Sequence, residues 1–398
     1  MKKKLIVQLF FSYYPINFSG GVEKVLATMS NLGVQKGYQV IDICNDAPGK
    51  KLFFPLDKRV KFYNLGLLRA RIPLYKRIIT VFLRKLCLNI KNPTDTHAVK
   101  LLAAQINRIL KNREVYAFIC YSYRDAVIAS LLASSAPKIL MDHGGSSAGT
   151  MLEIDSRPPV ELSALKHIAA FQTLMPGFVK QAKKLLSLKT VCIPNIVPQV
   201  KSLPRAKQVK AKKIIINIGR MNKKHKCQHL LVEAFAKIPA EQRMGWELHL
   251  YGEAQTLRGK IYQKSIERLI KKQRLSSQVF LKGLTKEPLK VLQNADICGF
   301  PSAYEGFGLS LAEAMSAGLP AVGFSYAPAV NELIKDGQSG FLCRDVDDYS
   351  DKLALLLKDG KLREKMGKNA QRQMREYSAD KIWAKWEKLF AELTPPAV

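Results

Sequence analysis

The sequence predicts an α/β protein with two doubly wound domains, and three observations lead to this expectation. Short apolar runs alternate with helix-like patterns along the whole chain, as in parallel sheets with crossover helices. Residues 194–213 interrupt the alternation with a stretch rich in Pro and Lys, which is typical of a linker between domains. The 398 residues, of which 47% are hydrophobic, are enough to fill two cores.

The apolar runs give the expected strands in order. In the first half they occupy residues 4–10, 38–44, 117–122, 138–142, 170–175 and 190–194. In the second half they occupy residues 213–219, 246–252, 278–283, 295–301 and 319–324. We therefore expect a first domain over residues 1–194 and a second over residues 195–377.

A last helix is expected after the second domain. It follows Ser378, a good capping residue, and one of its faces carries Ile382, Trp386, Leu389 and Phe390. Such a helix needs a surface to cover. We expect residues 378–398 to cross back and pack on the first domain.

Charge and cysteines limit the partners and the compartment. Lys plus Arg exceed Asp plus Glu by 64 − 32 = +32, which indicates an anionic partner such as a membrane surface, nucleic acid or phosphorylated substrates. The 7 cysteines are scattered and never form a C-x-x-C pair, which is typical of reduced thiols in a cytoplasm. The start "MKKKLIVQLFF" is interpreted as a buried strand because no small-residue cleavage site follows it. No apolar run reaches the ~18 residues of a membrane span.

The stretch "EGFGLSLAEAMSAGLP" (residues 305–320) holds Glu305 and Glu313 around a pair of glycines. Because glycines disfavour a helix, we expect Glu305 in a loop after a strand and Glu313 in the first turn of the helix that follows. The amides near Phe307, Gly308 and Leu309 would then face a phosphate or diphosphate. Glu313 is suited to bind vicinal hydroxyls such as those of a ribose, and Glu305 a second polyol.

A structural alternative exists for the same residues. "SLAE" also matches a capping box, in which Glu313 bonds back to the amide of Ser310.

The stretch "NIGRMNKKHK" follows an expected strand and precedes an expected helix, so it places Arg220 and Lys226 where two cations can clamp a diphosphate. Lys223 and Lys224 compete with Lys226 for this role, and a solvated basic loop is the alternative interpretation.

The segment Glu305 to Val322 closely resembles the signature of the family 4 glycosyltransferases, with a Glu, seven residues, a second Glu and then "AMSAGLPAV". The resemblance extends to "FSGGVEKVLATMSNLGVQKGYQV", "PNIV", "NIGRMNKKHKCQHLLVEAF" and "GQSGFLC", and so covers nearly the whole chain. It implies the GT-B architecture, in which two Rossmann-like domains face each other across a cleft. It also implies a retaining enzyme that uses a nucleotide-sugar donor, most commonly a UDP-sugar.

The resemblance assigns roles to further residues. It implies that Arg220 and Lys226 stabilise the leaving diphosphate, although Cys227 stands where the family usually has Gly. A His near position 143 binds the transferred sugar in the enzymes that the chain resembles, so His143 is the candidate. Lys282 and Gly283 lie where the family reads the base. No metal and no cofactor are expected, because cations and helix amides take the place of a metal.

Gly20 and Gly21 precede the first expected helix, whose amides can face the same diphosphate from the first domain. A tight turn is the alternative. The absence of G-x-G-x-x-G here counts against a dehydrogenase. Asp142, next to His143, would suit a general base, but that is the chemistry of an inverting enzyme.

Residues 67–91 carry seven Lys or Arg and no acid, with apolar residues at helix-like spacing. This pattern predicts a basic amphipathic helix on an anionic membrane surface. We therefore expect a peripheral enzyme on the inner face of the cytoplasmic membrane, with a lipid-linked saccharide acceptor, as in bacterial lipopolysaccharide, O-antigen or capsule assembly. A soluble acceptor is the alternative. Nucleic acid is not an expected partner, because no basic module with exposed aromatics is present.

Overall fold

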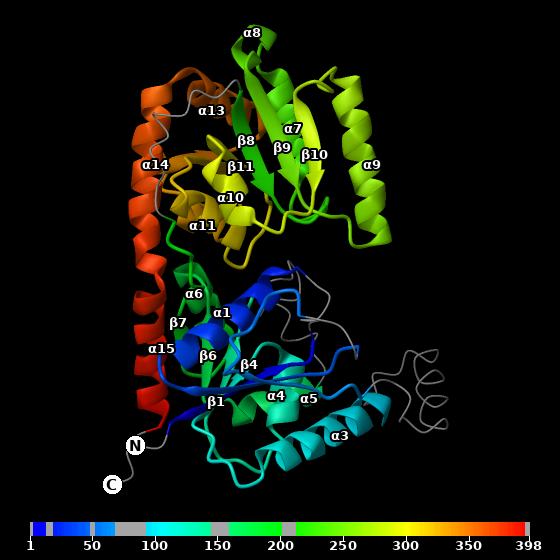
Figure 1. Cartoon of the computed structure of the whole chain (residues 1–398), viewed down its shortest axis with the longest axis vertical. Helices are drawn as coiled ribbons and strands as arrows, with labels where there is room; N and C mark the ends of the chain where they lie inside the picture. The colour runs from blue at the N-terminus through cyan, green and yellow to red at the C-terminus, as the bar shows by residue number, and fades with distance from the viewer. Residues whose placement is uncertain are drawn as a thin grey trace. The chain divides into compact units, whose positions relative to one another are not determined.

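The computed structural model describes residues 3–12, 19–47, 52–67, 93–144, 159–200 and 212–394. The chain divides into two compact units, Met1–Ile193 with Trp383–Val398 and Pro194–Ile382 (Figure 1). Each unit is built on a parallel sheet with helices around it, with seven strands in the first and six in the second. The predicted α/β class with two parallel sheets is confirmed.

The first unit has the strand order β3-β2-β1-β4-β5-β6-β7. Its strands are β1 (Leu5–Phe10), β2 (Gln39–Cys44), β3 (Lys61–Asn64), β4 (Ala117–Cys120), β5 (Lys138–Met141), β6 (Ala170–Thr173) and β7 (Thr190–Cys192). Its helices are α1 (Gly21–Gln35), α3 (Pro93–Leu110), α4 (Tyr123–Ala129), α5 (Pro159–Ala164), α6 (Pro176–Leu185) and α15 (Ala379–Leu393).

The second unit has the strand order β10-β9-β8-β11-β12-β13. Its strands are β8 (Lys213–Ile218), β9 (Trp246–Tyr251), β10 (Val279–Gly283), β11 (Ile297–Phe300), β12 (Ala321–Phe324) and β13 (Gly340–Cys343). Its helices are α7 (Gln228–Lys237), α8 (Ala240–Arg243), α9 (Leu257–Lys272), α10 (Pro288–Gln293), α11 (Leu309–Ser316), α12 (Val330–Leu333), α13 (Val346–Lys358) and α14 (Gly360–Met374).

Each strand order reverses once. In the first sheet the reversal lies between β1 and β4, which pair in the register Ile6↔Ala117. In the second it lies between β8 and β11, which pair in the register Ile215↔Ile297. In open parallel sheets, ligands bind outside the carboxyl ends of the strands at such a reversal.

Two strands in the structure, β3 and β13, were not predicted. Each has only four residues and lies at an edge of its sheet. Residues of β3 are exposed or half-buried, so they lack the continuous apolar run by which central parallel strands are found.

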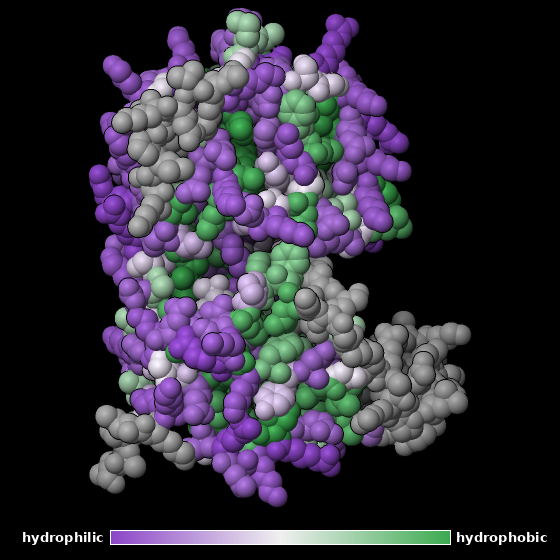
Figure 2. Space-filling view, viewed as in Figure 1, coloured by the Kyte–Doolittle hydropathy of each residue, from purple (hydrophilic) through white to green (hydrophobic). Residues whose placement is uncertain are grey.

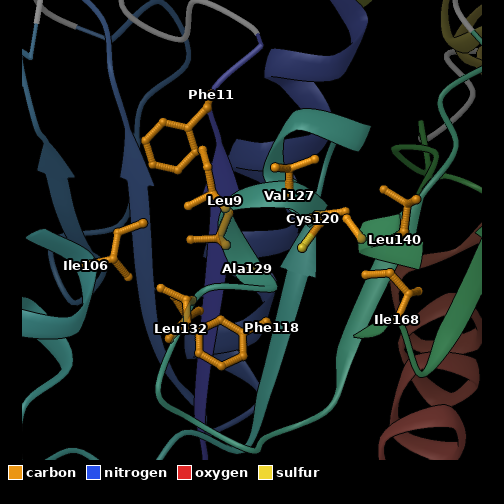
Figure 3. Packing of buried hydrophobic residues seen from close by; sticks show 14 of the residues in the cluster. Leu9, Phe11, Ile106, Phe118, Cys120, Val127, Ala129, Leu132, Leu140 and Ile168 are labelled. Carbon is orange, nitrogen blue, oxygen red and sulfur yellow. The ribbon is translucent and has the colours of Figure 1, made fainter. Parts of the chain in front are cut away.

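The core of the first unit lies between its sheet and the helices that cover it. Figure 3 shows side chains from β1, β4 and α4 packed together, among them Leu9, Phe118 and Val127. Leu9 and Phe118 are 0% exposed. Because parallel strands are covered on both faces, these runs are apolar without alternation.

Helix α15 packs on the first unit although it follows the second in the sequence. The predicted apolar face is confirmed, since Ile382, Trp386, Leu389 and Phe390 are all buried. The ring of Trp383 meets that of Tyr38 edge-on at 5.5 Å. Gly33 of α1 lets this helix approach β2 closely, since a Cβ there would lie only 2.8 Å from Val40 Cγ2.

Residues 68–91 of the predicted membrane-binding segment lie outside the described residues. Within the described ranges we find no helix with the length and hydropathy of a membrane span.

We predict that Trp383→Ala destabilises the first unit by about 3–5 kcal/mol, because the substitution leaves a large cavity between α15 and α1. The free energy of unfolding from denaturant titration measures the effect. The exposed Lys388→Ala on the same helix is the control and should change it little. Equal effects of the two substitutions would mean that α15 is not a structural part of this unit.

Candidate active site

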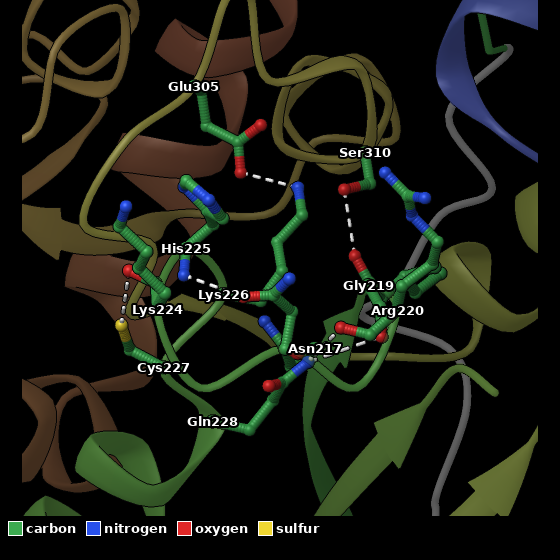
Figure 4. A network of polar contacts seen from close by, with 12 residues as sticks. Asn217, Gly219, Arg220, Lys224, His225, Lys226, Cys227, Gln228, Glu305 and Ser310 are labelled. Carbon is green, nitrogen blue, oxygen red and sulfur yellow. Dashed lines mark hydrogen bonds and ion pairs between the residues drawn. The ribbon is translucent and has the colours of Figure 1, made fainter. Parts of the chain in front are cut away.

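The candidate site of the second unit lies at the carboxyl ends of β8 and β11. The loop 219–227 follows β8, and the loop 301–308 follows β11. Because the two strands are neighbours, the two loops meet, and the amide of Ala303 donates to the carbonyl of His225 at 2.9 Å. In Figure 4 the side chains of Arg220 and Lys226 extend from the first loop toward Glu305 and Ser310.

Lys226 and Glu305 form the central polar contact of this site. The Lys226 Nζ lies 2.5 Å from Glu305 Oε1, and the side chains are 21% and 11% exposed. The ammonium also lies 5.8 Å from the centre of the Phe300 ring. A partly buried ion pair is costly to desolvate, so the groups that hold it must fit closely. The result is a cation fixed in position beside the start of α11.

The structure distinguishes among the three lysines that the sequence left open. Lys223 and Lys224 are exposed, whereas Lys226 is half-buried and paired with Glu305. Arg220 is also exposed, at the first turn of the same loop. Lys226 is therefore the lysine with a defined orientation toward the loop after β11.

Helix α11 begins at Leu309, and its N-cap is Gly308 with φ 82° and ψ 53°. A glycine is favoured in this left-handed conformation because a Cβ would be strained there. The ring of Phe307 is buried, and its centre lies 5.5 Å from that of Tyr377. The amide-rich start of α11 is thus where the sequence predicts it.

One expectation about this helix and one alternative are wrong. Glu313 is the fifth residue of α11, just beyond the predicted first turn, and only 3% of it is exposed. The capping box is also absent, because Ser310 lies inside the helix rather than at its N-cap. The Ser310 hydroxyl donates instead to the carbonyl of Ile218 at 2.8 Å, which ties α11 to the end of β8.

Glycines allow three backbone segments to meet at this edge of the sheet. A Cβ on Gly252, which has φ 145°, would lie 1.9 Å from the carbonyl oxygen of Gly219. The Gly252 amide donates to the carbonyl of Gly283 at 2.9 Å. Gly283 therefore lies on the same edge as Gly219, two strands away. Its neighbour Lys282 places its ammonium 4.8 Å from the Phe280 ring.

Three buried polar groups around the same loops were not predicted. Asn217, Gln228 and Ser302 each bury an oxygen that has no hydrogen-bond partner among the described residues. The amide of Gln228 donates to the carbonyl of Arg220 at 2.9 Å, and that of Asn217 to Gly299 at 2.8 Å. The sequence signal that could have identified them was a polar residue near the end of an apolar strand, as Asn217 is, and another at the start of the next helix, as Gln228 is. The Gln228 amide thus holds a carbonyl of the loop in place, and the Asn217 amide joins β8 to β11.

Cys227 has φ 48° and ψ 36°, the left-handed conformation that glycine adopts most readily. This explains in physical terms why the resembled family favours Gly at this position. The thiol is buried and lies 3.1 Å from the carbonyl oxygen of Lys223. A buried contact thus accompanies a strained backbone at the start of α7.

The predicted residues of the first unit lie at the carboxyl edge of its own sheet. Gly20 is the N-cap of α1 with φ −78° and ψ 164°, an extended conformation open to any residue, and Gly21 begins the helix. His143 follows β5, and its neighbour Asp142 accepts a hydrogen bond from the Gly144 amide at 2.9 Å. The backbone angles of Gly20 are open to any residue, so a tight turn at this position would not require a glycine.

His143 stacks on Tyr121, with ring centres 5.2 Å apart and planes at 11°. Burial lowers the pKa of His143 to about 3, so the imidazole is neutral at neutral pH. The Tyr121 hydroxyl donates to Gln8 Oε1 at 2.5 Å. A neutral imidazole held in this way is able to exchange hydrogen bonds with a hydroxyl but not to act as a cation.

The polar network continues from Gln8 to Asp42. The Gln8 amide donates to Asp42 Oδ1 at 2.8 Å and to Ser30 Oγ at 2.7 Å. The Ser30 oxygen also lies 2.8 Å from the Leu26 carbonyl and 2.6 Å from Asp42 Oδ2. The hydroxyl has one proton for these two acceptors, so a proton on Asp42 satisfies both contacts. Burial accordingly raises the pKa of Asp42 to about 7.

The predicted residues thus fall into two sets, each described within its own unit. In the second unit, Arg220, Lys226, Glu305, Phe307, Gly308 and Leu309 lie on the two meeting loops, Lys282 and Gly283 lie farther along the same edge, and Glu313 is buried in α11. In the first unit, Gly20, Gly21 and His143 follow strands of one sheet. Among the described residues, no cluster of three or more His, Cys, Asp or Glu is arranged to hold a metal ion.

Comparisons with known proteins relate the chain to glycosyltransferases. Residues 201–373 match the family described as Glycosyl transferases group 1. The chain is 32% identical over 187 residues to a poly(ribitol-phosphate) alpha-N-acetylglucosaminyltransferase of Staphylococcus aureus, covering 46% of this chain and 36% of that protein. It is 30% identical over 186 residues to an N-acetyl-alpha-D-glucosaminyl L-malate synthase of Bacillus anthracis, covering 46% of each.

A solved structure matches over nearly the full length. It is a mutant of TarM from S. aureus, in complex with fondaparinux, alpha-GlcNAc-glycerol and UDP. The TM-score is 0.74 at 17% identity, covering 97% of this chain and 99% of that one. The chain therefore has the GT-B fold, and its residues 201–373 match the group 1 glycosyltransferase family. Its matches span between a third and a half of the two curated relatives.

We predict that Cys227→Gly is more stable than Cys227→Ala by about 1 kcal/mol, because both lose the thiol but only glycine relieves the left-handed strain. Thermal or denaturant unfolding measures the difference. At the buried Cys343 of β13, which has no such backbone, the order should reverse. The same order at both positions would contradict the role of the backbone angle.

A second prediction concerns pH. Because the folded pKa of Asp42 is raised from 3.8 to about 7, folding favours the protonated form, and this stabilisation is lost as pH rises from about 4 to about 7. The loss is on the order of 4 kcal/mol at most. Asp42→Asn should therefore gain stability relative to the wild type across this range. The exposed Asp351→Asn is the control, and a difference independent of pH would contradict the prediction.

Proposed function

We propose that the protein is a retaining glycosyltransferase that moves a sugar from a nucleotide-sugar, most simply a UDP-sugar, to a lipid-linked saccharide. The observation that carries this proposal is the Lys226–Glu305 pair at the β8/β11 reversal, beside the start of α11. Fixed cations and free amides at one point suit a diphosphate that gains charge as it leaves. The UDP in the complex of the TarM mutant supports a uridine nucleotide.

In the proposed reaction the bond between the anomeric carbon and the diphosphate oxygen breaks. Lys226 and Arg220 balance the charge that develops on the diphosphate, together with the amides of Phe307, Gly308 and Leu309. The acceptor hydroxyl forms the new bond on the same face of the sugar, and its proton passes to the leaving phosphate oxygen. No side chain has to act as a base, which fits the lowered pKa of His143, since an imidazole that is hard to protonate is a weak base.

The other candidate residues bind the donor in this proposal. Glu305 orients Lys226 and accepts from sugar hydroxyls, and Glu313 binds a ribose or keeps the α11 backbone in place. His143 contacts the transferred sugar, and Gly20 and Gly21 offer amides to the diphosphate. Lys282 and Gly283 contact the base. No metal or cofactor is required, since the cations of the loop neutralise the diphosphate.

The proposal for the acceptor is based on the positive charge of the chain. A net charge of +32 suits an anionic partner, and residues 67–91 concentrate seven cations without an acid. We therefore propose peripheral association with the cytoplasmic face of the membrane and a role in lipopolysaccharide, O-antigen or capsule assembly. The S. aureus relative acts on a phosphate polymer, which supports an anionic acceptor. The L-malate synthase favours a second candidate, a small soluble anionic acceptor.

A panel of nucleotide-sugars tests the donor. The wild-type protein should hydrolyse one member slowly or gain thermal stability with it, and Glu313→Ala should weaken that stabilisation. Adding a lipid-linked saccharide or a soluble anionic acceptor then separates the two acceptor classes. No response to any member of the panel would refute the proposed activity.

We predict that Lys226→Ala lowers the rate of nucleotide release from the responding donor about 10²–10³-fold, because a charge on the leaving group loses its fixed partner. Glu305→Gln should lower it less if Glu305 acts mainly by orienting Lys226. The exposed Lys223→Ala, which removes the same charge from the same loop, is the matched control. Equal losses for Lys226→Ala and Lys223→Ala would show that only the net charge of the loop matters.

A further inference from the structure

Helix α9 has an inner face that fully accounts for its packing. Gly259, Tyr262, Ile266 and Ile270 are buried at spacings of three and four residues. The Tyr262 hydroxyl accepts from the His229 amide of α7 at 2.9 Å. At the N-terminus, Thr256 Oγ1 accepts from the amide of Gly259 at 3.0 Å. The fold of the second unit therefore needs nothing from the opposite face of α9.

That opposite face begins with two aliphatic side chains in solvent. Leu257 is 75% exposed and Ile261, one helical turn later, is 62% exposed. A single exposed leucine needs no explanation, but two aliphatic side chains one turn apart on the same helix face indicate an interaction surface. Figure 2 shows hydrophobic surface at this end of α9, and hydrophilic surface along the rest of the helix.

The same face continues with cations. At 100° per residue, Lys264 and Arg268 lie in line with Leu257 and Ile261, and Lys260, Lys271 and Lys272 flank them. All five cations are exposed. With Arg258 the helix holds six basic residues against one acid, Glu267, whose carboxylate accepts a hydrogen bond from Gln263. None of the six forms an ion pair with another described residue.

We propose that the α9 face, defined as Leu257, Lys260, Ile261, Lys264, Arg268, Lys271 and Lys272, docks on an anionic lipid bilayer. The aliphatic pair would enter the headgroup boundary, while the long cationic side chains reach lipid phosphates. This surface belongs to the second unit and is separate from residues 67–91. It rests on the proposed membrane association for its purpose, and on the described side chains for its existence.

The composition of the α9 face favours a bilayer over two other partners. Single-stranded nucleic acid is bound with exposed aromatic side chains, but the one aromatic residue of α9, Tyr262, is buried. A second copy of the chain in a symmetric contact would bring the same cations together, which is repulsive. An anionic surface with an apolar layer below it matches both the charge and the aliphatic pair.

The α9 face is relevant to the proposed activity because α9 contacts the loop 219–227 of the candidate site. A Cβ at Gly259 would lie 3.1 Å from the carbonyl oxygen of Met221, the residue after Arg220. The first turn of α9 therefore packs directly against the loop 219–227. Docking through α9 would hold that loop close to the bilayer.

Sedimentation with vesicles of phosphatidylcholine, with and without phosphatidylglycerol, tests this inference on the full chain. The wild type should bind the anionic vesicles and be released by salt. Leu257→Ser/Ile261→Ser should weaken binding about tenfold or more, and Lys264→Gln/Arg268→Gln about fivefold per charge removed. Both pairs are exposed, so the fold should persist, as a thermal unfolding curve verifies.

Matched variants in the same unit are the controls. Lys361→Gln/Lys365→Gln removes two exposed cations from α14, and Leu355→Ser removes an exposed leucine from α13. Equal weakening by these controls, unchanged binding of the α9 variants, or retention of the wild type by DNA but not by vesicles would overturn the inference. Hydrolysis of the nucleotide-sugar without vesicles is measured in parallel. Its absence in the wild type would count against the proposed activity alone, because the α9 face contains no residue of the proposed site.

Discussion

The pairing of β8 with β11 is the interaction on which the candidate site depends. The two strands are about eighty residues apart in sequence, yet they are neighbours in the sheet through Ile215↔Ile297 and Ile216↔Cys298. Two hydrogen bonds that involve side chains extend this short ladder. The Asp296 carboxylate accepts from the Ile214 amide, and the Ser310 hydroxyl donates to the Ile218 carbonyl. The loop with Lys226 and the loop with Glu305 meet only because these strands do. A change that shifted this register would separate the pair without altering either side chain.

The close approach of these loops has a conformational cost that falls on a few residues. Gly252 and Gly308 meet it without strain, the first through its missing Cβ and the second through its left-handed backbone. Cys227 adopts a similar backbone with a side chain, so part of the cost remains in the folded state. The carbonyls of Gly219 and Arg220 in the loop are in turn held by the buried amide of Gln228. Strain and buried polar groups thus gather where the backbone is most constrained.

The sequence predicted what local patterns encode. Continuous apolar runs gave the central strands, and the spacing in α15 gave its buried face. The edge strands β3 and β13 escaped because they are short and partly exposed. The capping box failed for a long-range reason, since the Ser310 hydroxyl bonds to a carbonyl ninety-two residues away. Likewise, no local feature of the sequence separates Lys226 from Lys223 and Lys224. Lys226 is distinguished by its ion pair with Glu305, which belongs to another loop.

Burial explains why the charge of this chain is found at its surface. Asp42 is 0% exposed, and its contacts with Gln8 and Ser30 are best satisfied by the neutral acid. Lys226 lies in a less buried place, where a carboxylate lies beside it. Lysines and arginines without such a partner have to remain in water, and with twice as many bases as acids many do so. A cationic surface is therefore the default for this chain, and charge alone does not identify a binding face. What distinguishes α9 is that its outward cations are in line with two exposed aliphatic side chains, which water does not favour and which only an apolar partner would cover.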